Sequence, residues 1–520
     1  MSTQAHSQPR TRRSVAAITV AALAFTTAAC SVLLDRTVDQ CKTDGDCASF
    51  GGHPYCRSGV CVASNLGPEG CFYGAPSSPV EFANQCSTAQ CQPFDNCARL
   101  GLCGPDAAPP VPVAPPVPDA GPAPVDAGPP PEGGTPDAAP PPPALPPCVD
   151  PARNTVVIGG STAVQPFLAV VAPLLAKNSP PYTIAYQPSG SCSGVDNLFS
   201  PDPAKHIAKD IAGKQALLFA ADGTTTACTL GDGVPVDVAA SDVFASSCTS
   251  TYATSDTLAE YLGPIQPMTF VVPSTSPETS ISAEMAHVVF GLGTTGGGVQ
   301  PYVDPTLFFI RNSGSGTQQM ISRAIEIDAK KWWGGDRGGS GKVRDLLEAV
   351  PQTKSGSSIG ILSTDFADTE RARLRILAFK AKGQSCGYLP DSTPFTRDKL
   401  NVRDGHYAIW GPVHFYAQVS GGVPSAAAAA LVTRFSLPRL DAPLLDAITK
   451  SGLVPACAMK VQRTSEMGPL TPFSPNFQCG CYFEANVPNG AAPPSCVPCN
   501  GPSDCAAATP ACNNGFCEAK

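Results

Sequence analysis

Three segments of the chain share one pattern of apolar and polar positions. In each, a short apolar run typical of a buried strand leads into a loop of glycine and hydroxyl residues, and apolar residues then return at helical spacing. In the first segment, Val156–Ile158 precede the loop Gly159–Thr162. The apolar positions after that loop are Val164, Phe167, Leu168, Val171, Leu174 and Leu175. The pattern predicts strand, loop and helix in succession, as in an α/β protein.

The second segment runs from Tyr182–Tyr186 into the loop Ser189–Gly194, and the third from Tyr302–Ile310 into Arg311–Gln319, "RNSGSGTQQ". A loop in this position places hydroxyl groups and free backbone N–H groups at a helix N-terminus, which favours an anion. Arg311 would add a fixed charge and a two-donor fork. Taken alone, the loop Gly159–Thr162 favours an ordinary N-cap.

A further strand-like stretch, "VDVAASDVFAS", ends its apolar run in Ser241-Asp242. A carboxylate repels a fully ionised oxyanion, but it accepts a hydrogen bond from an oxyanion that still carries a proton. Asp242 therefore fits a site that selects a protonated anion.

The N-terminus has the features of an export signal. Three arginines, Arg10, Arg12 and Arg13, precede the apolar run Val15–Ala29, which is too short to span a membrane. The run ends in "TAAC" at Cys30, which resembles a bacterial lipobox with threonine where leucine is usual. An ordinary signal-peptidase site is the alternative.

The cysteine count supports the lipid anchor. Of 23 cysteines, 22 remain if Cys30 carries lipid, and disulfides could use up that even number. Disulfides indicate an oxidising compartment. We therefore expect an exported protein of the periplasm or cell envelope, anchored through Cys30; Ser31 after it points to the outer membrane as one location.

Composition divides the rest of the chain. Residues 1–30 are interpreted as a lipoprotein signal peptide, 31–103 as a Cys-rich disulfide module, 104–147 as a Pro/Ala-rich linker, 148–477 as the globular body and 478–520 as a second Cys-rich module. The linker holds 19 of the 57 prolines and cannot build a core. As polyproline II, at about 3.1 Å per residue, it could reach roughly 130 Å as a semi-rigid spacer.

The two Cys-rich ends share an internal repeat. In Cys41–Cys61 and Cys499–Cys517 a cysteine is followed by five residues ending in aspartate, a second cysteine, a variable gap, a third cysteine, four residues containing glycine and a fourth cysteine. The frame resembles small modules of exported bacterial proteins, and two disulfides would replace a missing core. Cys496 and Cys499 have the CxxC spacing of zinc ligands, but no histidine accompanies them, so disulfides are favoured.

Charge narrows the partners. The chain has 34 basic and 42 acidic residues, a formal net charge of −8, so there is no basic face to follow the phosphates of a nucleic acid. Any anion site must work through local donors.

The ordered motifs "GGSTAVQPF", "YQPSGSCSGV", "VAASDVF", "PMTFVVPSTSP", "IRNSGSGTQQ", "SSIGIL" and "VRDGHYAIWGP" resemble the phosphate-binding proteins of bacterial ABC importers. The resemblance covers about residues 154–416. It implies a two-lobed α/β clamshell of the type II periplasmic-binding-protein class, flanked here by the disulfide-rich modules and the linker. It also implies a dehydrated tetrahedral oxyanion bound in the cleft between the lobes.

The resemblance also implies the ligand-binding residues. Carried over by position, these are Ser161, Thr162, Ala163, Ser191, Asp242, Arg311, Ser315, Gly316 and Thr317. Two departures stand out. Ser313 replaces the aspartate that pairs with the arginine in many importers, which should leave Arg311 more available. Cys192 replaces a small residue, and we expect it in a disulfide with Cys228 or Cys248.

Other motifs are set aside. The loop Gly334–Val343 looks like a phosphate-binding P-loop but fails its pattern, because Val343 stands where Ser or Thr must bind magnesium, so we interpret it as an exposed loop. The motif "GSCSG" has cysteine, not serine, at the centre of a nucleophile-elbow pattern, and nucleophilic catalysis would also need a nearby base. The histidines of the body (His206, His287, His406 and His414) have no triad or metal spacing, so structural roles are expected. Trp332 and Trp333 are expected to pack at a helix end.

We therefore expect a non-enzymatic lipoprotein, without cofactor or metal, that binds phosphate or a similar oxyanion for delivery to an ABC permease. The alternative is a cell-surface sensor or adhesion protein that displays the clamshell as a recognition module on the proline stalk. The Cys-rich modules and the stalk, which a plain importer subunit does not need, keep that alternative open.

Overall fold

The computed structural model describes residues 41–49, 55–57, 60–62, 71–72, 74–104, 107–113, 115, 144–295 and 298–520. The predicted signal peptide with Cys30 and most of the proline-rich segment lie outside them. The chain forms two compact units, Met1–Ala75 and Pro76–Lys520. Among the described residues, no helix combines the length and the apolar character needed to cross a membrane.

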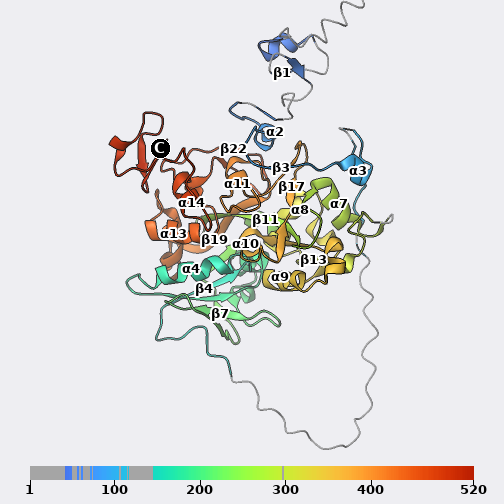
Figure 1. The fold of residues 1–520 in the computed structure, drawn as a ribbon. Helices are drawn as coiled ribbons and strands as arrows, with labels where there is room; N and C mark the ends of the chain where they lie inside the picture. Colours follow the sequence, from blue (N-terminus) through green and yellow to red (C-terminus); the bar gives the residue numbers. More distant parts are fainter. Residues whose placement is uncertain are drawn as a thin grey trace, which may run out of the picture. The chain divides into compact units, whose positions relative to one another are not determined.

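The larger unit is built on one mixed sheet with twelve strands in the described residues (Figure 1). The strand order is β14-β13-β15-β11-β19-β10-β4-β5-β7-β8, with β16 beside β11 and β20 beside β19. The strands are β4 (Thr155–Gly160), β5 (Thr183–Gln187), β7 (Ala216–Phe219), β8 (Thr225–Cys228), β10 (Val238–Ser241), β11 (Leu258–Pro273), β13 (Phe308–Ile310), β14 (Gly335–Asp336), β15 (Ile359–Ser363), β16 (Leu374–Ile376), β19 (Trp410–Ser420) and β20 (Val423–Pro424).

Two long antiparallel strands, β11 and β19, join two lobes. A register shift between Leu262 and Ile265 divides β11 into halves. Before the shift, β11 pairs with the part of β19 that also pairs with β10, whereas after the shift it pairs with β15 and β16. The first lobe therefore holds β4, β5, β7, β8 and β10, and the second holds β13, β14, β15 and β16. The predicted two-lobed α/β fold is confirmed.

The core of the first lobe shows why its sequence pattern predicted a helix. The helices of this lobe are α4 (Gln165–Leu175), α5 (Ser191–Phe199), α6 (Ala245–Cys248), α12 (Ala426–Val432) and α13 (Ala442–Lys450). All six apolar positions predicted after the first loop are buried. They pack against β4 and against α12 and α13, so the helical period of the sequence is the buried face of α4.

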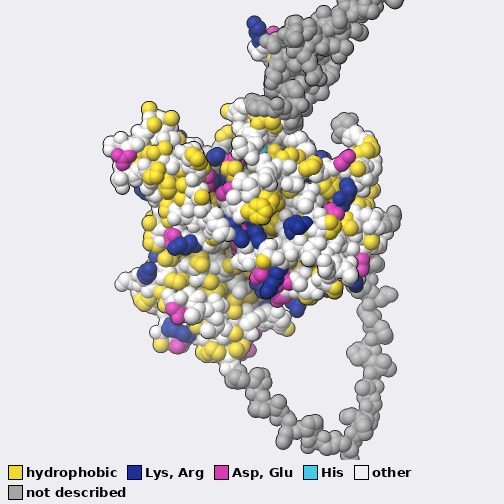
Figure 2. Space-filling model, viewed as in Figure 1, with side chains coloured by type: hydrophobic (Ala, Val, Ile, Leu, Met, Phe, Trp, Pro, Cys, Tyr) yellow, Lys and Arg dark blue, Asp and Glu magenta, His cyan; other side chains and the backbone are white. Residues whose placement is uncertain are grey.

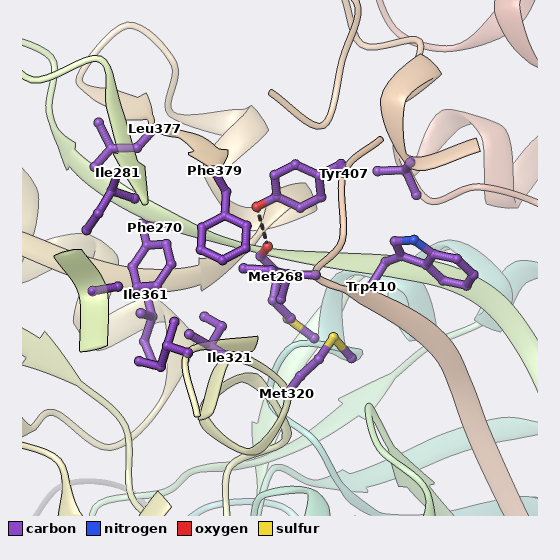
Figure 3. Close-up of a cluster of buried hydrophobic side chains, with 14 of the residues drawn as sticks. Met268, Phe270, Ile281, Met320, Ile321, Ile361, Leu377, Phe379, Tyr407 and Trp410 are labelled. Atoms are coloured by element: carbon purple, nitrogen blue, oxygen red, sulfur yellow. Dashed lines mark hydrogen bonds between the residues drawn. The ribbon is translucent and has the colours of Figure 1, made fainter. Parts of the chain in front are cut away.

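The core of the second lobe is larger and rich in aromatic residues (Figure 3). Phe270 of β11 packs between Phe290 and Phe379, with ring centroids 5.8 Å apart in each pair. Tyr407, fully buried, donates a 2.7 Å hydrogen bond to the backbone carbonyl of Met268, so its hydroxyl is satisfied within the core. The helices of this lobe are α7 (Ala283–Leu292), α8 (Gly316–Ala324), α9 (Ser340–Glu348), α10 (Thr364–Thr369) and α11 (Leu400–Asp404).

Residues 76–103, which we call the arm, precede the body and belong to the same compact unit. We expected residues 31–103 to form one module, but the larger unit begins at Pro76. Cys91 forms a disulfide with Cys386, and β3 (Cys91–Gln92) adds to a small sheet with β12 (Ser280–Ser282), β17 (Ala378–Lys380) and β18 (Gly387–Tyr388). The arm also holds α2 (Pro79–Ala83) and α3 (Asn96–Leu100). Covalent and backbone bonds thus fasten it to the second lobe.

Both described ends of the proline-rich segment contact this same unit. The amide of Val113 donates to the carbonyl of Gly291, and the indole of Trp333 donates to the carbonyl of Val113. At the other end, the amide of Thr229 donates to the carbonyl of Pro146. Residues near both ends of this segment are therefore hydrogen-bonded to the larger unit.

The cysteines form the expected disulfides. All 22 cysteines after Cys30 are disulfide-bonded. In both repeats the first cysteine pairs with the third and the second with the fourth: Cys41–Cys56, Cys47–Cys61, Cys499–Cys512 and Cys505–Cys517. Cys496 pairs with Cys481, so neither cysteine of the CxxC motif is a free thiol.

The aspartate of the repeat has the same role in both copies. In each, one carboxylate oxygen accepts two backbone N–H groups: Asp46 from Lys42 and Thr43, and Asp504 from Asn500 and Gly501. The C-terminal copy also holds β23 (Ala511–Asn513) and β24 (Phe516–Glu518), and α14 (Gly480–Asn486) precedes it. The smaller unit holds β1 (Tyr55–Arg57) and β2 (Val60–Val62). The repeated frame therefore encodes a loop closed by one carboxylate and two disulfides.

Removing the Cys91–Cys386 disulfide should loosen the arm. This bond spans 295 residues, whereas the neighbouring Cys97–Cys103 bond spans 6. Because a longer closed loop restrains the unfolded chain more, we expect C91S/C386S to lower the free energy of unfolding by about 5 kcal/mol and C97S/C103S by about 2 kcal/mol. Calorimetry of both double variants measures the difference; equal losses would contradict the arm's role.

Candidate anion-binding site

The three predicted loops meet at one edge of the sheet. β4 runs parallel to both β5 and β10, and β13 runs parallel to β14 and β15. The carboxyl ends of these strands therefore meet where the two lobes contact each other, and we call this interface the cleft; ligands of α/β sheets bind at such carboxyl ends. The first lobe contributes Ser161, Thr162, Ser191 and Asp242, and the second contributes the residues from Arg311 to Thr317.

Tyr186, on β5, holds the first loop in place. Its hydroxyl donates to the carbonyl of Ser161, and the Ser161 hydroxyl accepts the amide of Ala163 at 3.0 Å. The carbonyl of Ala163 accepts the side-chain amide of Gln266, on β11, at 3.0 Å. The loop is thus fixed to both β5 and the strand that joins the lobes, leaving the hydroxyl of Thr162 to reach across the cleft.

Ser191 connects the two lobes beside Asp242. Its hydroxyl donates to Oδ2 of Asp242 at 3.2 Å and accepts the amide of Gly316, at the start of α8, at 3.1 Å. A Cβ atom at Gly316 would lie 2.5 Å from Oγ of Ser191 and 2.6 Å from Oδ2 of Asp242. Only glycine allows the N-terminus of α8 to approach the carboxylate this closely.

Asp242 is a buried acid with unused hydrogen-bonding capacity. It is 1 % exposed, and its Oδ1 atom has no hydrogen-bond partner in the described part of the chain. Burial raises its pKa to about 6, against the opposing effects of the nearby Ser161 hydroxyl, the charge of Arg311 and the Ser191 hydroxyl. A group poised in this range can both accept and release a proton near neutral pH.

Arg311 reaches across the cleft with its whole guanidinium group. Nη2 donates to Oγ1 of Thr162 in the first lobe at 2.9 Å, Nη1 to Oγ of Ser340 at 2.8 Å, and Nε to the carbonyl of Gly338 at 2.5 Å. The Thr162 and Ser340 hydroxyls are themselves 3.3 Å apart. One cation therefore ties the first loop to the segment that opens α9.

No carboxylate of the described residues forms an ion pair with Arg311, although it is only 3 % exposed. Its three partners are neutral oxygens. Burial lowers its pKa to about 10, partly offset by the charges of Asp242 and Asp336. A buried cation without a counter-ion is costly, so this arrangement is stabilised by any anion that enters beside it.

Three helix N-termini face the same place. α5 begins at Ser191, α8 at Gly316 and α9 at Ser340. Thr317, in the first turn of α8, is fully buried and its hydroxyl has no partner among the described residues. Ser315, the N-cap of α8, is 2 % exposed and its side chain makes no capping bond. Backbone N–H groups and unused hydroxyls thus surround the Asp242–Arg311 pair.

The structure explains the two departures. Ser313 does not contact Arg311: its carbonyl accepts the side chain of Gln319. Oxygens of Thr162, Ser340 and Gly338 take up the guanidinium instead. Cys192 pairs with Cys248, one of the two expected partners, and so joins α5 to α6 rather than facing the cleft as a thiol.

Sequence reasoning missed Ser340. We interpreted residues 334–343 as an exposed loop, and for Ser340 that is wrong: its side chain is fully buried against Arg311 and Thr162. The reason is the short strand β14, which aims the glycine-rich loop into the cleft. The available signal was the sequence itself, a glycine and serine loop directly before a helix, as in the three loops that were recognised.

Lys214 was also missed. This half-buried side chain donates to the carbonyl of Ser189, in the second loop, at 2.5 Å. Burial lowers its pKa, and the positive charge of Arg311 adds to that effect. Lys214 is therefore a second cation, close enough to Arg311 for the two positive charges to interact.

The histidines and tryptophans set aside earlier pack as expected. His287 and His406 each bond a backbone carbonyl through a ring nitrogen at 2.7 Å, and the nitrogen of His414 lies 2.7 Å from Glu260. Trp332 is buried against Phe290, with ring centroids 4.7 Å apart. Each has a structural partner outside the cleft.

No protein-family model matches the chain, and no curated protein matches it. Among solved structures, a protein from Clostridium perfringens described as a phosphate ABC transporter substrate-binding protein with bound phosphate is 16 % identical, with a TM-score of 0.39, over 58 % of this chain and 100 % of its own. An ABC-type phosphate transport receptor from Vibrio cholerae is 15 % identical, with a TM-score of 0.37, over 58 % and 99 %.

The OxyR regulatory domain of Pseudomonas aeruginosa is 10 % identical, with a TM-score of 0.31, over 57 % of this chain and 97 % of its own.

Replacing Asp242 by asparagine should change how stability depends on pH. Because the folded-state pKa of about 6 exceeds the ordinary value of 3.8, the folded protein holds the proton more tightly and loses stability as pH rises between these values. Asp242→Asn lacks this loss. Between pH 4 and pH 7 we therefore expect the free energy of unfolding of Asp242→Asn to rise by about 2 kcal/mol relative to that of the unaltered protein.

Urea titrations in phosphate-free buffer at the two pH values measure the effect. Asp256→Asn, at an exposed aspartate, is the matched control. A difference between Asp242→Asn and the unaltered protein that does not change with pH would show that the Asp242 carboxyl is not held in its protonated form by burial.

Proposed function

We propose that this chain is an exported lipoprotein that binds inorganic phosphate, or a similar tetrahedral oxyanion, in the cleft between its lobes and delivers it to an ABC importer. The role is binding, without catalysis. The observation that carries the proposal is the buried guanidinium of Arg311, which has no ionic partner among the described residues and lies among helix N-termini. A compact anion would neutralise the guanidinium and accept hydrogen bonds from those N–H groups.

The assigned roles follow from the contacts. Arg311 would exchange its neutral partners for a charge-assisted bond to the anion. The unpartnered hydroxyl of Thr317 and the N–H groups at the start of α8 would add neutral donors, with Ser161, Thr162 and Ala163 opposite them and Ser315 and Gly316 alongside.

Asp242 would decide which anion is accepted. When ionised, it can accept a hydrogen bond from a phosphate that still carries a proton, and its free Oδ1 atom is available for that bond. Sulfate is fully ionised near neutral pH and offers no such proton. It would therefore be repelled by the buried carboxylate of Asp242, which would be left without a hydrogen-bond donor.

The display alternative has less support. A recognition module on a proline stalk needs the stalk to separate the module from what precedes it. Here residues 113 and 146, near the two ends of the proline-rich segment, bond to the same compact unit, and Cys91 is cross-linked to it. The lipid anchor at Cys30 would tether the chain ahead of these contacts.

Calorimetric titration of the whole mature chain with phosphate, sulfate, arsenate and molybdate tests the proposal. The whole chain is used because Cys91–Cys386 and Cys457–Cys479 join its flanking segments to the body. We expect phosphate to bind with micromolar or tighter affinity, sulfate to bind at least about a hundredfold more weakly, and Arg311→Ala to abolish binding.

Asp242→Asn should retain phosphate binding at reduced affinity and narrow the preference over sulfate. Arg373→Ala removes a 68 % exposed arginine side chain outside the cleft and should change nothing. If no oxyanion binds the unaltered protein, or if Arg311→Ala binds phosphate as well as the control does, the cleft is not an oxyanion site.

A further inference from the structure

A second cavity lies in the second lobe, away from the cleft. Its volume is about 510 Å³, and its lining combines three arginines, Arg371, Arg375 and Arg397, with apolar residues that include Leu374, Leu389 and Phe395. None of its lining residues belongs to the Asp242–Arg311 site. A volume of this size is in the usual range of small-molecule sites, roughly 300–1,000 Å³. On the face shown in Figure 2, hydrophobic and basic side chains lie side by side over the region of α10 and β17.

The cavity wall carries more positive than negative charge. Arg371, Arg397 and Lys399 share the two carboxylates of Asp368 and Asp391 at ion-pair distance. Three cations therefore face two anions within one buried network. The carboxylate of Asp398, in the same loop, accepts bonds from Ser392 and Leu400 instead.

Arg375 adds another positive charge. Its guanidinium donates to the backbone carbonyls of Ser274, Ser276 and Glu278, and no carboxylate of the described residues lies at ion-pair distance from it. The cavity lining therefore holds three arginines and one carboxylate, that of Asp391, and the ion pairs behind it add Lys399 and Asp368. An anionic ligand is the complement of such a surface.

Arg397 has one buried donor atom without a hydrogen-bond partner among the described residues. Its Nη1 atom lies 3.1 Å from Oδ1 of Asp368, but this buried nitrogen has no hydrogen-bond partner in the described part of the chain. The side chain is only 16 % exposed. A largely desolvated guanidinium with an unmet N–H group binds a carboxylate well, because the cost of removing water has already been met in folding.

Phe395 lies at the edge of the cavity, on a loop whose backbone is held in place by hydrogen bonds. The ring is 87 % exposed, the highest exposure among the large hydrophobic residues of the described chain. Arg371 donates to the carbonyls of Pro394 and Thr396 at 2.8 and 3.0 Å, which fixes the backbone on both sides of the ring. An aromatic side chain held in water next to an apolar cavity marks a contact surface for an apolar ligand.

We propose that this cavity binds a small organic anion whose carboxylate pairs with Arg397 and whose aromatic or aliphatic body packs on Leu374, Leu389 and Phe395. The site is separate from the oxyanion cleft. The expected ligand is an amphiphilic acid. Inorganic phosphate has no apolar group to pack against the leucines and Phe395, and a neutral aromatic compound has no charged group to pair with the arginines.

Phenylbutyrate, with the neutral alcohol phenylbutanol as its counterpart, tests the proposal by calorimetric titration of the whole chain in saturating phosphate. Saturating phosphate occupies the cleft, so that the organic acid is measured at the second cavity alone. We expect phenylbutyrate to bind once per chain and phenylbutanol at least about tenfold more weakly, the loss expected for one charge-assisted bond. Phe395→Ser and Arg397→Gln should each weaken phenylbutyrate binding by about tenfold.

Two controls separate the site from general effects. Arg373→Gln removes an exposed cation close in sequence to Arg375, and Val423→Ser removes a hydrophobic residue that is 67 % exposed elsewhere. Neither should change binding. Arg397 belongs to a buried network, so if Arg397→Gln does not fold, Phe395→Ser, at an exposed position, carries the test. Equal binding of the acid and the alcohol, or unchanged binding by Phe395→Ser, would overturn the proposal.

Discussion

The cleft depends on one constraint, the burial of Arg311 without a carboxylate to neutralise it. A guanidinium cannot lose its proton near neutral pH, so the protein must supply other compensation. It does so with two hydroxyls, a carbonyl and a ring of helix N-termini that are themselves suited to negative charge. The cost of the buried cation is thereby coupled to the presence of an anion, which explains how a protein with a net charge of −8 could attract one locally.

The same cation also joins the two lobes. Thr162 belongs to the first lobe and Ser340 to the second, and Arg311 bonds both. Ser191 and Gly316 form a second bridge beside it. The backbone of both lobes is joined by β11 and β19, whose pairing is interrupted by the register shift between Leu262 and Ile265. An anion that entered beside Arg311 would compete with these bonds, so we expect occupation of the site to change how the two lobes are held together.

Much of the fold was predictable because burial imposes periodicity. The apolar positions from Val164 to Leu175 are buried as the pattern requires, and the loops before α4, α5 and α8 lie where strand, loop and helix were expected. The repeat of cysteine and aspartate predicted two disulfides per module because its spacing is local. What could not be predicted depends on distant pairs: Cys91 with Cys386, and Ser340 with Arg311 and Thr162. No short-range pattern records which loop will meet which across a cleft.

The most direct test of the account locates the anion itself. A crystal of the whole chain grown with arsenate would be measured at the arsenic absorption edge, where the anion identifies itself by anomalous scattering. The account predicts one strong peak in the cleft, within hydrogen-bond distance of the Arg311 guanidinium and of an Asp242 carboxylate oxygen, with the Thr162 and Ser340 hydroxyls displaced from that guanidinium or sharing it. A cleft without a peak, still closed by the direct Arg311–Thr162 bond, would contradict it.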